Sequence, residues 1–123
     1  MIRAVWNGAV LAETPDTVRV EGNDYFPPES VRREFFSESS AKSLCPWKGV
    51  ARYYTVTVDG QVNANAAWYY PKPSPLARRI KNHVAFWNGV HIEGEAEGRG
   101  AEGTGQAAQA GAGRRPTWLG GKR

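Results

Sequence analysis

Residues 50–70 have the sequence VARYYTVTVDGQVNANAAWYY, and this stretch predicts the centre of the fold. Residues 50–58 are rich in β-branched and aromatic side chains, which favour a β-strand. The strand ends at Asp59-Gly60, a dipeptide typical of a two-residue hairpin turn because both of its positions require positive φ. Residues 62–70 then return as a second strand. We therefore expect this hairpin to lie at the centre of an antiparallel sheet.

Two more hairpins are expected on either side of the central one. Asn7-Gly8 separates two short apolar runs within residues 3–12, which predicts a hairpin at the start of the domain. Asn88-Gly89 separates residues 84–87 from residues 90–92 and predicts a third hairpin. Three tight turns of this kind indicate a fold made mainly of antiparallel hairpins.

The residues between the hairpins predict one more strand and one or two short helices. Residues 17–21 alternate apolar and polar side chains, as a strand with one buried face does. A short helix is expected over residues 29–36, which follow a pair of prolines, and another over residues 76–81. Residues 37–42 are polar and are expected to form a connection. The predicted fold class is therefore mainly β, and α+β at most.

Length and charge limit the domain organisation and the partners. The chain of 123 residues is long enough for one hydrophobic core. Residues 1–94 carry eleven Lys and Arg against nine Asp and Glu, a formal charge of +2, so we expect no nucleic-acid partner. Residues 95–123 are rich in Gly and Ala and poor in large apolar side chains, which predicts a disordered, basic tail after a domain of residues 1–94.

The cysteine and histidine content argues against a metal site. Cys45 is the single cysteine, which excludes an internal disulfide and a multi-cysteine zinc site. His83 and His91 fall in predicted strands and are not spaced as a pair of ligands. We expect no metal and no other cofactor. The N-terminus has no signal-peptide pattern and no run approaches the ~20 apolar residues of a membrane helix, so we expect a cytoplasmic protein without a membrane partner.

A tight turn is predicted at Cys45-Pro46-Trp47-Lys48-Gly49, where Pro and Gly flank two residues. The turn would display the side chains of Cys45, Trp47 and Lys48. A cationic amine close to sulfur favours the thiolate, so Cys45 and Lys48 are candidate catalytic residues for nucleophilic or redox chemistry. The alternative is that Cys45 packs as a small apolar group beside a solvated lysine.

Aromatic side chains with polar tips are more numerous than a buried core can accommodate, because each buried hydroxyl or indole N–H needs a partner. On the second central strand, Trp68 and Tyr70 are expected to share a face with the small residues Ala64 and Ala66, which would form a concave floor. Such a site could stack a flat ring and neutralise an anionic group. The alternative is a β core in which the rings supply bulk. The candidate ligand-binding residues are Arg3, Tyr25, Trp47, Lys48, Tyr53, Trp68 and Tyr70.

Four motifs follow one another as Glu21-Gly22-x-x-Tyr25-Phe26-Pro27-Pro28, Cys45-Pro46-Trp47-Lys48-Gly49-x-Ala51-x-Tyr53-Tyr54, Ala67-Trp68-x-Tyr70-x-x-Pro73 and Ile80-x-x-His83-Val84-Ala85-Phe86-Trp87. In this order they resemble the DUF427 family, small bacterial and plant proteins of unknown function. The resemblance implies a compact domain similar to the β-tent folds, in which many relatives carry zinc between two cysteine-bearing loops. This chain lacks those cysteines. The family has also carried a nucleotidyltransferase label, but the chain has no Gly-Ser with paired Asp of such enzymes.

Three functions remain open at this point. The first is a domain that binds a small anionic or ring-containing metabolite. The second is a thiol-dependent enzyme that uses Cys45 activated by Lys48. The third is a structural or interaction module, and the surplus of aromatic residues is also compatible with a symmetric homodimer. The chain has no P-loop, dinucleotide-binding motif or Gly-x-Ser-x-Gly elbow, which leaves the usual kinase and hydrolase chemistries unsupported.

Overall fold

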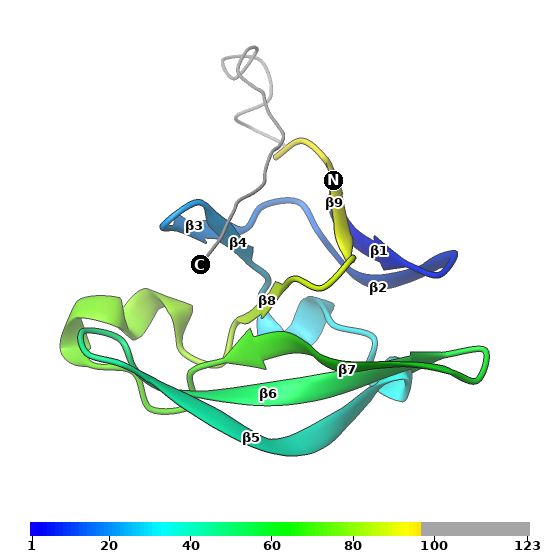
Figure 1. Ribbon diagram of the computed structural model, residues 1–123. Helices are drawn as coiled ribbons and strands as arrows, with labels where there is room; N and C mark the ends of the chain where they lie inside the picture. Colours follow the sequence, from blue (N-terminus) through cyan, green and yellow to red (C-terminus); the bar gives the residue numbers. More distant parts are fainter. Residues whose placement is uncertain (97–123) are drawn as a thin grey trace.

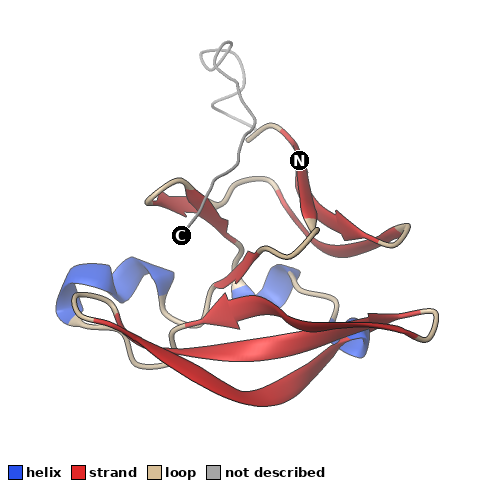
Figure 2. Ribbon diagram, viewed as in Figure 1, coloured by secondary structure: helices blue, strands red, loops and turns tan. Residues whose placement is uncertain are grey.

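Antiparallel strands dominate the part of the chain that the computed structural model describes, residues 1–96 (Figures 1 and 2). The strands are β1 (Ile2–Trp6), β2 (Ala9–Thr14), β3 (Val18–Val20), β4 (Asn23–Tyr25), β5 (Phe36–Cys45), β6 (Gly49–Val58), β7 (Gln61–Tyr69), β8 (Val84–Phe86) and β9 (His91–Gly94). The 3₁₀ turns are η1 (Pro28–Ser30), η2 (Arg33–Phe35) and η3 (Pro75–Ile80). A larger sheet has the strand order β5-β6-β7-β8, a smaller sheet has the order β2-β1-β9, and β3 pairs with β4. The predicted fold class, mainly antiparallel β, is confirmed.

Two of the predicted hairpins are confirmed. β6 and β7 pair across Asp59 and Gly60, whose φ values of +50° and +78° are those that the turn requires. β1 and β2 pair in the same way across Asn7 and Gly8, with φ values of +50° and +79°. Local turn chemistry was therefore sufficient to predict both hairpins.

A bulge in β7 changes which side chains share a face. The register of β7 against β6 shifts between Tyr54 and Val56 of β6, and Asn65 on β7 has a φ of +53°. Ala66 and its neighbour Ala67 are both buried in the same core, while Ala64 is exposed. The predicted face that joins Ala64 and Ala66 to Trp68 is therefore wrong, because the bulge breaks the alternation on which it depended.

The third predicted hairpin is wrong, although its turn is present. Asn88 and Gly89 have φ values of +53° and +88°, but β8 pairs with β7 and β9 pairs with β1. The turn instead carries the chain from the larger sheet to the smaller one (Figure 1). Trp87, which precedes the turn, is bonded to β7: its backbone N–H donates to the Ala66 carbonyl and its indole N–H to the Asn65 carbonyl.

The helix predicted over residues 29–36 is also wrong. Its place is taken by the separate turns η1 and η2. Between them Val31 forms a β-bridge with Ala12, and the Arg32 N–H donates to the Leu11 carbonyl over 2.8 Å. The backbone is extended here because it pairs with β2. The second predicted helix corresponds to η3, which is a 3₁₀ element.

Residues 37–42 lie within β5 and do not form the predicted connection. Among the described strands β5 pairs with β6 alone, which makes it an edge strand. Its register shifts between Glu38 and Lys42. Polar side chains and a bulge are common on edge strands because they discourage pairing with other chains, so the polar composition was a misleading signal.

Two cores hold the elements together. The first joins the two sheets and includes the fully buried Leu11, Phe26 and Val56. The second includes Tyr25, Ile80 and other residues that alternate along the larger sheet with those of the first. No helix within residues 1–96 is long and apolar enough to cross a membrane. The predicted tail lies outside the described residues from residue 97 onward.

Gly49, the first residue of β6, allows a test of the turn before it. Its φ of +117° is one that L side chains rarely adopt, and a Cβ there would lie 3.2 Å from the Lys72 carbonyl oxygen. We expect Gly49→Ala to lower the melting temperature by about 5–10 °C, measured by circular dichroism. Gly60→Ala is the matched control, because its φ is +78° but no atom from elsewhere in the chain lies within 4 Å of the added Cβ. The melting temperature of the control should fall by about half as much as that of Gly49→Ala. Equal decreases in the two variants would contradict the crowding at Gly49.

Candidate functional site

The turn between β5 and β6 contains the Cys-Pro-Trp-Lys-Gly motif and buries its lysine. Ser74 holds the turn, because its N–H donates to the Lys48 carbonyl over 2.9 Å and its hydroxyl to the Trp47 carbonyl over 2.5 Å. Lys48 is only 5% exposed, whereas Trp47 is 38% exposed. The prediction that the turn displays Lys48 to solvent is therefore wrong.

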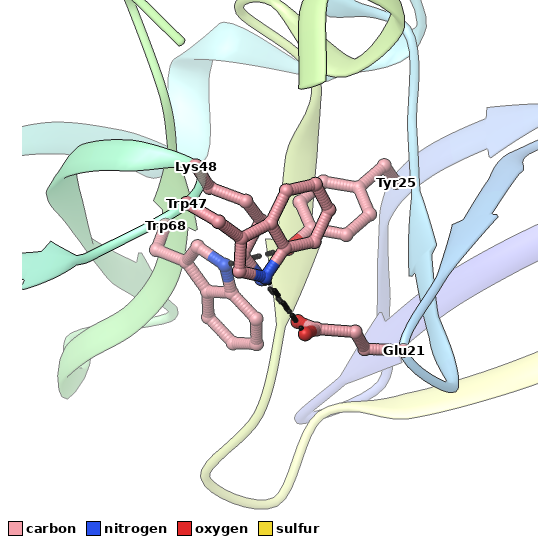
Figure 3. A network of polar contacts seen from close by, with 5 residues as sticks. All are labelled: Glu21, Tyr25, Trp47, Lys48 and Trp68. Carbon is pink, nitrogen blue, oxygen red and sulfur yellow. Dashed lines mark hydrogen bonds and ion pairs between the residues drawn. The ribbon is translucent and has the colours of Figure 1, made fainter. Parts of the chain in front are cut away.

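Lys48 is paired with Glu21, which lies at the tip of the β3–β4 hairpin (Figure 3). The ammonium Nζ lies 2.5 Å from Oε1 of Glu21, and the indole Nε1 of Trp47 donates to Oε2 over 3.1 Å. The Glu21 side chain remains 50% exposed, against 6% for Lys48. A half-exposed carboxylate therefore covers a buried ammonium.

Aromatic rings surround the ammonium of Lys48. Nζ lies 5.5 Å from the ring centroid of Trp47 and 5.4 Å from that of Tyr70, within the range of cation–π attraction. The Trp68 indole N–H donates to the hydroxyl of the fully buried Tyr25 over 3.3 Å (Figure 3). The residues of this Lys48 cluster are Glu21, Tyr25, Trp47, Lys48, Trp68 and Tyr70.

The charge states in the Lys48 cluster follow from its contacts. Burial by itself would lower the pKa of Lys48, but the hydrogen bond with Glu21 and the nearby Tyr25 and Tyr70 outweigh it and hold that pKa well above its usual value. The hydrogen bond from Lys48 is the main reason why the pKa of Glu21 is lowered. Burial raises the pKa of Tyr70 to about 12, against the opposing effect of the Lys48 charge. At neutral pH the cluster thus holds an ammonium, a carboxylate and neutral tyrosines, and Lys48 is a poor general base.

A group of three rings, which we term the aromatic wall, continues from the Lys48 cluster. Trp68 lies opposite Tyr53 on the neighbouring strand, and it contacts Trp87 edge-on with ring centroids 5.6 Å apart. Tyr53 and Trp87 lie 6.4 Å apart between centroids. Trp87 is 44% exposed, so the wall has an accessible surface. The aromatic wall consists of Tyr53, Trp68 and Trp87.

Positive charge without an ion-pair partner is found in the segment that contains Ser74 and η3. Residues 60–92 contain no Asp or Glu. Within this stretch, residues 72–81 carry several Lys and Arg, and we term them the basic segment. These cations form no ion pair within the described part of the chain. An open hollow of about 380 Å³ is lined by Pro75, Leu76, Arg78 and Arg79, next to the Ser74 that holds the turn. Cations without an ion-pair partner among the described residues therefore follow directly after Ser74 in the sequence.

A family model described as a domain of unknown function, DUF427, matches residues 1–98. The chain belongs to the DUF427 family. No curated protein matches the chain. The match spans every described residue, so the Lys48 cluster and the aromatic wall both lie within the DUF427 domain, and the resemblance seen in the sequence is confirmed.

The DUF427 domain brings together most of the predicted ligand-binding residues but not Arg3. Tyr25, Trp47, Lys48, Trp68 and Tyr70 meet in the Lys48 cluster, and Tyr53 lies in the adjoining wall. Arg3 is on β1 in the smaller sheet, where its Nε lies 2.6 Å from Oε2 of Glu13.

Cys45, the predicted nucleophile, is a half-buried free thiol that packs against the second core of the DUF427 domain. The ammonium that was expected to activate it points to Glu21. His83 contacts the Lys81 carbonyl through Nδ1, and His91 is on β9 in the smaller sheet. Within residues 1–96 no three His, Cys, Asp or Glu side chains are grouped to hold a metal ion.

Sequence reasoning missed two residues of the site, Glu21 and Trp87. Glu21 has a φ of +55° in a two-residue turn. The other described non-glycine residues with positive φ are four asparagines and one aspartate, residue types that tolerate this conformation better than glutamate does. Asn-Gly or Asp-Gly would fit this turn better than Glu21-Gly22 does. The glutamate in this place was the available signal that its side chain has a role beyond the turn.

The pH dependence of stability tests the ion pair. We expect Glu21→Gln to destabilise the fold by about 1–2 kcal/mol at pH 7, less than a fully buried pair would lose because Glu21 is half exposed. The pKa of Glu21 is lower in the folded state than in the unfolded state. The contribution of its carboxylate to the free energy of unfolding is therefore complete above the unfolded-state pKa and is lost as the pH falls through the folded-state pKa.

The difference in melting temperature between the wild type and Glu21→Gln should therefore be constant between pH 6 and 8 and should shrink toward pH 3. Glu29→Gln is the control, because Glu29 is exposed and makes no ion pair within residues 1–96. A difference for Glu21→Gln that does not change with pH would contradict the ion pair.

Proposed function

We propose that this DUF427 domain binds a small metabolite that carries a flat ring and an anionic group. The observation that carries the proposal is the buried Lys48 ammonium, whose carboxylate partner is half exposed and whose other neighbours are aromatic rings. Binding sites for small molecules combine apolar and aromatic lining with a few polar groups that fix orientation, and the Lys48 cluster has this composition.

The ring of the ligand would stack on the exposed aromatic surface. Trp47 and Trp87 each have a large exposed fraction. Trp47 contacts Lys48, and Trp87 contacts Trp68. Two- or three-ring surfaces of this kind gain about 0.5–1.5 kcal/mol per aromatic pair beyond the area that they bury. The anionic group would be attracted by Lys48 and by the basic segment, in which no acidic side chain intervenes.

Two other functions are less well supported. A thiol-dependent enzyme would need the Lys48 ammonium next to the sulfur of Cys45, and that ammonium bonds to Glu21. An interaction module or a homodimer would use the same exposed rings, but the buried charge beneath them would contribute little to a flat interface. A cytoplasmic location remains part of the proposal.

A panel of simple probes tests the binding function. We expect phenyl phosphate and benzoate to raise the melting temperature by about 3–8 °C at ten times their Kd, and benzyl alcohol to have no effect, because it lacks the charge. Lys48→Met should weaken binding at least tenfold, and so should Trp87→Ala, which removes a surface ring. The exposed Lys42, in the same hairpin, is the matched control as Lys42→Met. No shift with either anion, or equal binding by both lysine variants, would overturn the proposal.

The role of Cys45 can be tested separately. We expect Cys45→Ser to bind phenyl phosphate and benzoate within about twofold of the wild type, because the thiol packs in the second core and makes no described contact with Lys48. Iodoacetamide should alkylate Cys45 no faster than free glutathione, because the thiol is half-buried. Rapid alkylation at neutral pH together with lost binding in Cys45→Ser would favour the thiol-dependent enzyme instead.

A further inference from the structure

Two hydrogen-bond donors converge on the two oxygens of one carboxylate in the Lys48 cluster. Lys48 Nζ donates to Oε1 of Glu21, and Trp47 Nε1 donates to Oε2 (Figure 3). Both donors come from one turn, which Ser74 holds through its two hydrogen bonds. The turn therefore forms a rigid receptor for a planar carboxylate, one donor for each oxygen.

The carboxylate that occupies this receptor is held far less firmly. Glu21 belongs to a hairpin of two three-residue strands, and its own φ of +55° is unfavourable for a glutamate. The base of the hairpin is fixed, because Tyr25 is fully buried and the Thr17 hydroxyl donates to Oδ1 of Asp24 over 2.7 Å. At the tip, a Cβ on Gly22 would meet no atom from elsewhere in the chain within 4 Å. Movement of the tip out of the receptor would therefore break the two hydrogen bonds of Glu21 and leave the base of the hairpin in place.

We propose that the Glu21 carboxylate is an internal stand-in for the carboxylate of the ligand, so that the ligand is a ring-bearing carboxylate that displaces Glu21 from Lys48 and Trp47. The ring then lies along the aromatic wall and the hairpin tip moves out. The ring component of this inference rests on the proposed function; the carboxylate receptor does not. Glu21 is thus a residue that determines specificity, since it selects for an anion able to take two donors side by side.

Chemical rescue tests the receptor without knowledge of the natural ligand. Glu21→Ala removes the Cγ methylene and the carboxylate of the side chain, and propionate supplies both groups with one further carbon. We expect 50 mM sodium propionate to raise the melting temperature of Glu21→Ala by about 5 °C more than sodium chloride of equal ionic strength. Propionamide, the neutral analogue, should have no such effect.

The wild type and Glu13→Ala are the controls. The wild type already holds a carboxylate in the receptor, and Glu13 pairs with Arg3 and Arg32 at the surface, without a buried ammonium. Propionate should stabilise neither of them beyond the salt effect. Equal effects of propionate on Glu21→Ala and on the wild type, or no effect on either, would overturn the stand-in role of Glu21.

Benzoate distinguishes failure of this inference from failure of the proposed function. We expect Glu21→Ala to bind benzoate at least tenfold more tightly than the wild type and at least tenfold more tightly than it binds propionate, because the receptor is vacated and the ring contacts the wall. Propionate rescue without tighter benzoate binding would keep the receptor and refute the ring-binding function. Benzoate binding of equal strength in both proteins would keep the function and refute displacement of Glu21.

Discussion

An ammonium that is taken out of water must be paired, and in this domain the partner of Lys48 comes from a distant part of the chain. The penalty for burying an unpaired charge is several kcal/mol, which favours the position of the β3–β4 hairpin tip against the turn between β5 and β6 as long as no other anion pairs with Lys48. Ser74 reaches the same turn from the segment that precedes η3. One ion pair thus joins segments that are separate in the sequence. They supply Tyr25 and Trp47 to the Lys48 cluster, while Tyr70 directly follows β7.

Both cores of the domain contain buried tyrosines whose hydroxyls need polar partners. In the first core Tyr54 and Tyr69 stack with ring centroids 4.6 Å apart, and the Tyr69 hydroxyl donates to Oε1 of Glu38 over 2.9 Å. In the second core Tyr25 and Tyr70 lie close to Lys48. The tyrosines of the second core are therefore the ones that belong to the Lys48 cluster.

The parts of the fold that depend on neighbouring residues could be predicted from the sequence, and the parts that depend on distant ones could not. Asn7-Gly8 and Asp59-Gly60 specify their own turns, so both hairpins were correct. Asn88-Gly89 specifies a turn equally well, but which strands pair beyond it depends on β1 and β7.

The site shows the same limit. The rings and Lys48 were expected to lie together because period-two alternation and the turn motif place them near one another. Glu21 was missed because it meets Lys48 only through the tertiary fold, 27 positions along the chain. Stability alone does not explain this pair, since apolar residues of similar size often replace a buried ion pair without loss. Glu21 also has a φ that is unfavourable for glutamate. In addition, residues 60–92 contain Lys and Arg but no Asp or Glu. Lys48 would stay paired if a second carboxylate took the position of Glu21, whose side chain is half exposed. Exchange of the carboxylate therefore explains a glutamate at this turn better than a purely structural role does.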